Sequence, residues 1–231
     1  MSALKFLQSD AFDSADTHIR HKPFSFMTSA GLLDDAARAQ LAADFPRYPG
    51  AGFFPHEAVD CGPSINLLIE ELTSAKVADT IGAQLGIESL GQYPTLVTIC
   101  RALNKRHGTI HTDSRSKIAT ALLYLNESWP DTSDGCLRFL NRADSIEDMV
   151  CPELRPMYGN FAAFRRSENS FHGHLPFAGE RRVIQVAWLT SEDEKLRKTK
   201  RGKFSRLFKK LFGAIDRRIG AGRKDDASHL D

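Results

Sequence analysis

The sequence of 231 residues lacks several features that define whole classes of protein. No run of 18 uncharged apolar residues occurs, so a transmembrane helix is not expected. The start, MSALKFLQSDAFDSADTH, has no apolar core or cleavage site of a secretory signal. The few cysteines are widely spaced and form no C-x-x-C pair, which predicts neither a zinc knuckle nor a disulfide framework; they are Cys61, Cys100, Cys136 and Cys151. We therefore expect a cytoplasmic protein with reduced thiols.

Acidic residues are nearly missing from one part of the chain. Residues 195–224 carry 13 Lys and Arg against one acid, Asp216, a net charge of +12. The other residues carry 18 Lys and Arg against 28 Asp and Glu, a net charge of −10. The sequence thus combines a mildly acidic domain with a strongly basic tail, and the two parts need separate explanations.

The order of patterns along the chain predicts an α+β fold. Helical periodicity covers residues 30–45, 64–73 and 75–85, and the stretch 46–64, rich in Pro and Gly, is expected to form a loop. From residue 95 onward, short β-branched and aromatic segments alternate with turn residues: TLVTICRA, KIATALLYLN, CLRFLN, GNFAAFR and RRVIQVAWL. Helices followed by closely spaced strands favour a β-sandwich or jelly roll supported by N-terminal helices.

His111 and Asp113 form an H-x-D motif just before the strand expected over 117–125. In an extended segment, side chains at i and i+2 project to the same side, so the two groups can converge. A third ligand is available in His172 or His174, just before the last strand; the lead-in and spacing favour His172. Two His and one carboxylate make the facial triad of non-haem Fe(II) oxygenases. Taken alone, H-x-D also fits a surface histidine followed by a capping aspartate.

Two arginines, Arg181 and Arg182, stand at the head of the last strand. An arginine buried in a sheet needs a carboxylate partner, and its planar fork binds a carboxylate through two bonds. A dicarboxylate cosubstrate that chelates iron at one end could pair with this arginine at the other. Alternation groups Arg182 with Trp188 and Arg181 with Gln185, and both faces contain apolar residues. Parity therefore leaves the choice open.

Together these motifs resemble the 2-oxoglutarate/Fe(II) dioxygenase superfamily in its prolyl-4-hydroxylase-like branch. The resemblance covers about residues 95–190 and rests on five ordered matches. These are the H-x-D motif, the YLN sequence at 124–126, the turn DGCL at 134–137 with Asp134 in place of a glycine, the strand GNFAAF at 159–164, and the distal His172. Arg182, six residues before Trp188, matches the basic residue that binds the tail of 2-oxoglutarate.

The resemblance implies a double-stranded β-helix core over residues 95–190, with residues 1–94 as a helical support region of the same domain. Residues 191–231 are expected to form a linker and a basic amphipathic tail. It implies that His111, Asp113 and His172 bind Fe(II), and that Arg182 and Tyr124 bind 2-oxoglutarate. Arg101 would either contact the cosubstrate or form a surface ion pair. The implied reaction consumes O2, with ascorbate as a candidate reductant, and hydroxylates an unactivated C–H bond while 2-oxoglutarate becomes succinate and CO2.

The tail sequence KFSRLFKKLFGAIDRRI, residues 203–219, alternates apolar and basic residues with helical spacing. A basic amphipathic helix is typical of segments that bind an anionic membrane surface or a partner's groove. The same stripe could pack on this protein's own core or form a dimer contact. No aromatic stacking platform accompanies the charge, so we do not expect nucleic acid as the partner.

We therefore expect a cytoplasmic dioxygenase, peripheral at a membrane, whose substrate is lipid-linked or part of the cell envelope. Two alternatives remain open at this stage. One is a protein prolyl hydroxylase, and the other is a non-catalytic binding module on a degenerate oxygenase barrel.

Overall fold

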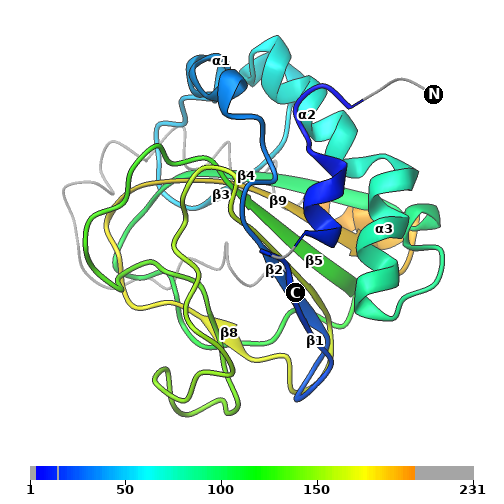
Figure 1. Ribbon diagram of the computed structural model, residues 1–231, viewed down its shortest axis with the longest axis vertical. Helices are drawn as coiled ribbons and strands as arrows, with labels where there is room; N and C mark the ends of the chain where they lie inside the picture. Colours follow the sequence, from blue (N-terminus) through cyan, green and yellow to red (C-terminus); the bar gives the residue numbers. More distant parts are fainter. Residues whose placement is uncertain (1–3, 15, 201–231) are drawn as a thin grey trace.

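The computed structural model describes residues 4–14 and 16–200. Its centre is an antiparallel sheet of seven strands in the order β1-β2-β7-β5-β9-β4-β3 (Figure 1). A second, two-stranded sheet pairs β6 with β8. The bounds are β1 His18–Arg20, β2 Phe26–Ser29, β3 Phe53–Pro55, β4 Thr95–Leu103, β5 Lys117–Tyr124, β6 Arg138–Phe139, β7 Phe161–Arg165, β8 His172–Gly173 and β9 Gly179–Leu189.

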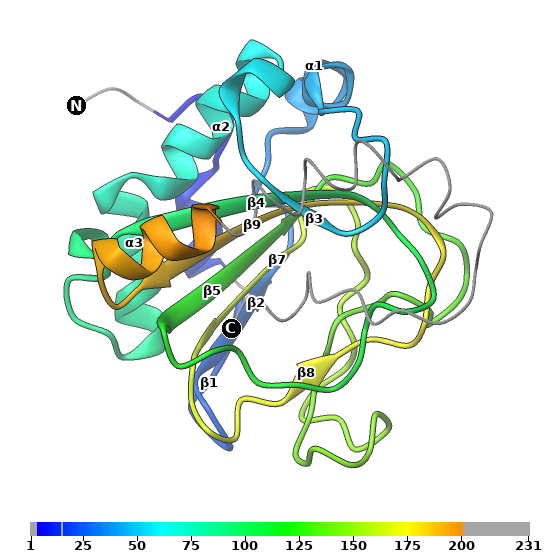
Figure 2. The ribbon, with the colours of Figure 1, turned by 180° about the vertical axis from the view of Figure 1, so that it is seen from behind.

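Three helices, α1 (Arg38–Asp44), α2 (Pro63–Thr73) and α3 (Ala75–Leu85), cover one face of the large sheet (Figures 1 and 2). Local signals set their ends: the Ser74 side chain accepts a hydrogen bond from the Val77 N–H, and Gly86 ends α3 in the left-handed region at φ 70°. Short 3-10 turns occupy Ser9–Asp13, Asp35–Ala37, Ala58–Asp60 and Leu90–Gln92. Residues 192–200 form a further helical segment after β9.

The strand alternation divides the core into two layers. Ile184, Val186 and Trp188 of β9 pack with the apolar stripes of α2 and α3. On the opposite face, Leu122 and Val183 pack with aromatic residues of the second sheet and of the loops around it. Because neighbouring residues of a strand face opposite sides, each strand contributes to both layers. The large sheet, the small sheet and the helical cover form a double-stranded β-helix fold with supporting helices, as expected.

The strands expected beyond residue 95 are confirmed, but the N-terminal region is not purely helical. Strands β1 and β2 extend one edge of the large sheet, and β3, within the stretch expected to be a loop, forms the other edge. The helix expected over residues 30–45 is shorter, with a 3-10 turn from Asp35 leading into α1. The expected tail helix, residues 203–219, lies outside the described residues. Among the described residues, no helix combines the length and apolar character needed to cross a membrane.

Candidate active site

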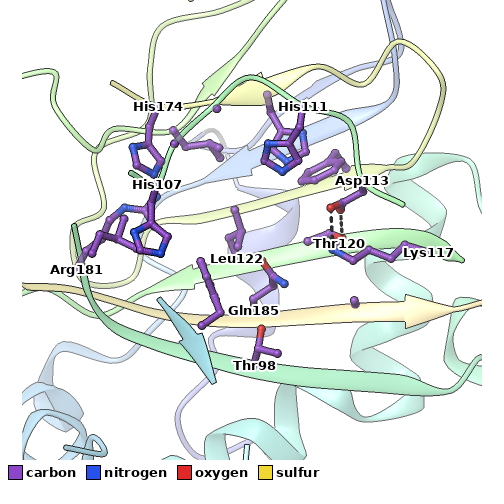
Figure 3. A pocket seen from close by; sticks show the side chains of 18 of the residues that line it. Thr98, His107, His111, Asp113, Lys117, Thr120, Leu122, His174, Arg181 and Gln185 are labelled. Carbon is purple, nitrogen blue, oxygen red and sulfur yellow. Dashed lines mark hydrogen bonds and ion pairs between the residues drawn. The ribbon is translucent and has the colours of Figure 1, made fainter. Parts of the chain in front are cut away.

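A cavity lies on the face of the large sheet that is turned away from the helices (Figure 3). Its floor comes from three adjacent strands, with Thr98 on β4, Leu122 on β5 and Gln185 on β9. Thr98 and Gln185 are direct partners in the antiparallel register, so their side chains project to the same side. The opposite wall includes His111 and His172. The cavity therefore lies between the two sheets, where a jelly-roll fold encloses its ligands.

The structure brings His111, Asp113 and His172 together. One ligand atom from each of the three lies within 4.8 Å of the others, and no other group of this kind occurs among the described residues. His111 and His172 face each other across an antiparallel bridge, in which each backbone N–H donates to the other's carbonyl at 3.0 Å. Asp113 reaches the same point because it is two residues beyond His111 in an extended segment.

Hydrogen bonds fix which nitrogen of each imidazole can bind a metal. The Nδ1 atom of His111 lies 2.9 Å from the Thr109 carbonyl oxygen, and Nδ1 of His172 lies 3.0 Å from that of Ser170. A carbonyl oxygen only accepts, so each Nδ1 carries a proton, and in the neutral ring Nε2 then carries the lone pair. The Phe164 ring packs on His172 with a centroid separation of 4.4 Å and restricts its orientation. Both imidazoles are thus oriented as metal ligands.

The protonation states also suit a metal. Burial, reinforced by neighbouring His111, lowers the pKa of His172 to about 3, so this imidazole is neutral at physiological pH. Burial raises the pKa of Asp113, but the nearby Lys117 charge and hydrogen bonds from Lys117 and Thr120 outweigh it and hold the pKa below its usual range. The neutral imidazole of His172 and the ionised carboxylate of Asp113, together with the imidazole of His111, are a donor set that fits Fe(II).

Lys117 was not expected at this site. Its Nζ donates to Oδ1 of Asp113 at 2.7 Å, and the Thr120 hydroxyl donates to Oδ2 at 2.5 Å. Lys117 enters the cavity because a bulge between Lys117 and Ala119 interrupts the alternation at the start of β5. The separation of four residues between Asp113 and Lys117 can be read from the sequence, but only the bulge directs the lysine side chain into the cavity.

Arg181 forms the cationic end of the cavity. It is 3% exposed, its Nε donates to the Gly135 carbonyl at 2.9 Å, and Nη2 donates to the Tyr124 hydroxyl at 3.2 Å. Tyr124 is fully buried behind Arg181, and burial raises the pKa of its hydroxyl, so this group stays protonated. Gly135 has φ 74°, and a Cβ there would lie 2.9 Å from the Trp129 ring. Gly135 is the glycine of the DGCL turn, and its backbone conformation places its carbonyl oxygen against the guanidinium group of Arg181.

The expected choice of Arg182 over Arg181 does not fit the structure. The side chain of Arg182 is paired with Glu180 and Glu127 and lies near the Phe45 ring, away from the cavity. The spacing to Trp188 does not identify the arginine of the cavity, because Trp188 packs in the layer under the helices. Arg182 shares that parity, whereas Arg181 shares the parity of Gln185 and Ala187, which line the cavity.

The remaining candidates divide between cavity and surface. Arg101 pairs with Glu180 at 3.4 Å and donates to the Pro46 carbonyl, so it occupies the ion pair that was its alternative role. His174 lines the cavity near Arg181, and His107, which is 5% exposed, lines it too (Figure 3). Thr98 and Gln185, which the sequence did not single out, form its polar floor.

Comparisons with known proteins agree with this geometry. The family model described as the 2OG-Fe(II) oxygenase superfamily matches residues 97–190. No curated protein sequence matches the chain. A prolyl-4-hydroxylase structure from Pseudomonas putida is similar, with 18% identity and a TM-score of 0.50, over 79% of this chain and 97% of that chain.

Two further solved structures resemble the chain less closely in overall superposition. One is a viral collagen prolyl hydroxylase from Paramecium bursaria Chlorella virus-1, with 14% identity and a TM-score of 0.46, over 71% of this chain and 94% of that chain. The other is a Trichoplax adhaerens prolyl hydroxylase, with 14% identity and a TM-score of 0.48, over 82% and 90%.

The Pseudomonas putida structure supports the fold, and the family match covers the strands that carry the triad and Arg181. The His-Asp-His cluster supplies the ligands that such a fold needs for iron. Residues 97–190 therefore form a domain of the 2OG-Fe(II) oxygenase superfamily, and this chain is a dioxygenase that uses Fe(II), 2-oxoglutarate and O2.

Proposed function

We propose that the enzyme hydroxylates an unactivated C–H bond of an organic or protein substrate and converts 2-oxoglutarate to succinate and CO2. Nε2 of His111, Nε2 of His172 and the Asp113 carboxylate would hold the iron. Bound iron supplies the activation of O2, with 2-oxoglutarate as the source of electrons. The observation that carries this proposal is the compact triad at the wall of a buried cavity whose far end holds Arg181.

Within this cavity, Arg181 would bind the distal carboxylate of 2-oxoglutarate through its guanidinium fork. The Tyr124 hydroxyl oxygen accepts a hydrogen bond from Arg181. The hydroxyl proton of Tyr124 is therefore directed toward another acceptor, such as the distal carboxylate of 2-oxoglutarate. The apolar side chains of Leu122, Leu137 and Phe164 line the space between the two ends. They exclude water, which strengthens the pairing of charges inside.

Anaerobic titration of the protein with Fe(II) and 2-oxoglutarate tests the site through the weak visible charge-transfer band of the chelate. We expect the band in the wild type, its loss in His111→Ala and His172→Ala, and its retention in His174→Ala. His174 is the matched control, because it lies in the same segment and lines the same cavity. A band that survives in His172→Ala but is lost in His174→Ala would identify His174 as the third metal ligand. No band in folded wild-type protein would refute the proposal.

For the substrate, the basic tail supports a lipid-linked or envelope molecule. Residues 203–219 would bind an anionic membrane surface and keep the enzyme peripheral at the cytoplasmic face. Their apolar and basic residues alternate with helical spacing, which suits an interfacial helix. Sedimentation with vesicles that contain phosphatidylglycerol tests this, and binding unchanged after Phe204, Phe208 and Phe212 are all replaced by Ser would refute it.

Prolyl hydroxylation is the second candidate, because the similar Pseudomonas putida structure is described as a prolyl-4-hydroxylase. This activity predicts that a proline-containing peptide, and no glycolipid, stimulates succinate formation from 2-oxoglutarate. Stimulation that persists when every proline is replaced by alanine would exclude it.

A further inference from the structure

A second, open cavity lies beside the metal site and takes no part in the reaction proposed above. Its walls are the loop from Thr112 to Ser116, Arg166 just after β7, and Thr190, Glu194 and Arg197 at the end of β9 and in the helical segment 192–200 (orange in Figure 2). Asp113 belongs to the lining of both cavities. We name this second cavity the arginine groove.

Positive charge exceeds negative charge in the arginine groove. Arg166 and Arg115 share one carboxylate, Glu168, at 3.0 and 3.4 Å, and Arg197 pairs with Glu194 at 2.6 Å. The carboxylate of Asp113, which also lines the groove, is balanced by the ammonium group of Lys117 at 2.7 Å. Three guanidinium groups therefore face two carboxylates.

A fourth cation lies against the same loop. Nζ of Lys198, a residue only 2% exposed, donates to the Ser114 hydroxyl at 3.1 Å. This lysine adds a buried cation behind the loop that lines the groove. A site in which guanidinium groups outnumber carboxylates attracts an anion.

The arginines differ in how firmly they are held. Arg166 is 15% exposed, and its Nε donates to the backbone carbonyl of Asp113 at 3.1 Å, which fixes its position. The side chains of Arg115 and Arg197 are 83% and 57% exposed. Ion pairs at such exposure contribute little stability, so these two can exchange their carboxylates for a ligand at small cost.

The arginine groove offers more hydrogen-bond donors than a single carboxylate group could accept from. Besides the arginines, four residues with side-chain hydroxyls line the groove, Thr112, Ser114, Ser116 and Thr190, and the Ser114 and Ser116 oxygens are 2.9 Å apart. A phosphate group has three or four acceptor oxygens and a larger charge, and it pairs with arginine forks through two parallel bonds. We propose that the arginine groove binds a phosphate group, carried by a soluble ester or by a lipid headgroup.

Isothermal titration of the full chain with inorganic phosphate, at constant ionic strength, tests the groove. In parallel, co-sedimentation compares vesicles of phosphatidylcholine with and without phosphatidic acid. The test variant is the double substitution Arg115→Gln and Arg197→Gln, which leaves Arg166 on its backbone carbonyl. The control is Arg142→Gln, a 63% exposed arginine that is also paired with carboxylates, Asp144 and Asp148, in the loop after β6.

We expect the double variant to bind at least about tenfold more weakly, which is about 1.4 kcal/mol, and the control to change less than about twofold. Weakening with inorganic phosphate assigns the groove to phosphate groups in general, and weakening confined to vesicles assigns it to a lipid headgroup. Equal binding by wild type and double variant with both probes, or no saturable binding of either, overturns the proposal. Oxygenase turnover plays no part in this test, so its result is independent of the proposed reaction.

Discussion

Replacing Arg181 by leucine should remove the cationic end of the metal cavity while leaving the triad in place. The guanidinium is 3% exposed and donates to Gly135 and Tyr124, so it is held in one position by the protein alone. Removing one partner of a buried ion pair costs about 3–5 kcal/mol, because the other charge stays desolvated. At about 1.4 kcal/mol per tenfold, the affinity for 2-oxoglutarate should fall by roughly a hundredfold to several thousandfold.

The neighbouring substitution Arg182→Leu is the matched control. The Arg182 side chain pairs with Glu180 and Glu127 outside the cavity, and such ion pairs contribute at most about 1 kcal/mol to stability. We expect less than about a fivefold change in 2-oxoglutarate affinity. The assay is anaerobic titration of the Fe(II)-loaded protein with 2-oxoglutarate, with thermal unfolding to confirm that each variant is folded. Equal losses in the two variants, or a loss below about tenfold in Arg181→Leu, would refute the assignment of Arg181.

Three further predictions concern stability and are measured by urea unfolding of the metal-free protein. Gly108→Ala should lose about 2 kcal/mol or more, because φ is 99° and the new Cβ would lie 2.4 Å from the His174 ring; an unchanged midpoint would contradict the close approach. Thr98→Val should gain about 1 kcal/mol, since the buried Thr98 hydroxyl has no hydrogen-bond partner among the described residues; a loss would show that this hydroxyl is bonded. Burial, with the nearby Arg181 charge, lowers the pKa of His174 from 6.5 to about 3. The neutral His174 therefore stabilises the folded protein above about pH 6.5, and this stabilisation is lost as the pH falls toward 3. The drop in unfolding free energy from pH 7 to pH 5 should therefore be about 2 kcal/mol smaller in His174→Asn than in the wild type, and equal drops would contradict the shift.

Much of the scaffold could be predicted because its signals are local. The α2 and α3 helices follow from apolar periodicity, with Ser74 and Gly86 as end signals. The strands from residue 95 onward follow from β-branched and aromatic segments between turns. Strands β1, β2 and β3 escaped prediction because they are three or four residues long and form only by pairing at the sheet edges, β1 with β2, β2 with β7 and β3 with β4.

The site shows the same division between local pattern and tertiary arrangement. The spacing of His111 and Asp113 in an extended segment places their side chains on one side, and the order of motifs indicated His172. The choice between Arg181 and Arg182 depended on which face of β9 the helices cover. Lys117 depended on a bulge, which shifts a side chain from one face of a strand to the other without a clear mark in the sequence.

The sequence by itself indicated a helical region followed by closely spaced strands, the candidate metal ligands and the separation of an acidic domain from a basic tail, since these depend on residue type, spacing and charge. Only the tertiary structure decided that Arg181 faces the cavity, that Lys117 and His107 lie inside it, and that three distant segments form the arginine groove. The reason is that an alternating strand offers two equivalent faces, and only the packing of the helices and of the second sheet distinguishes them.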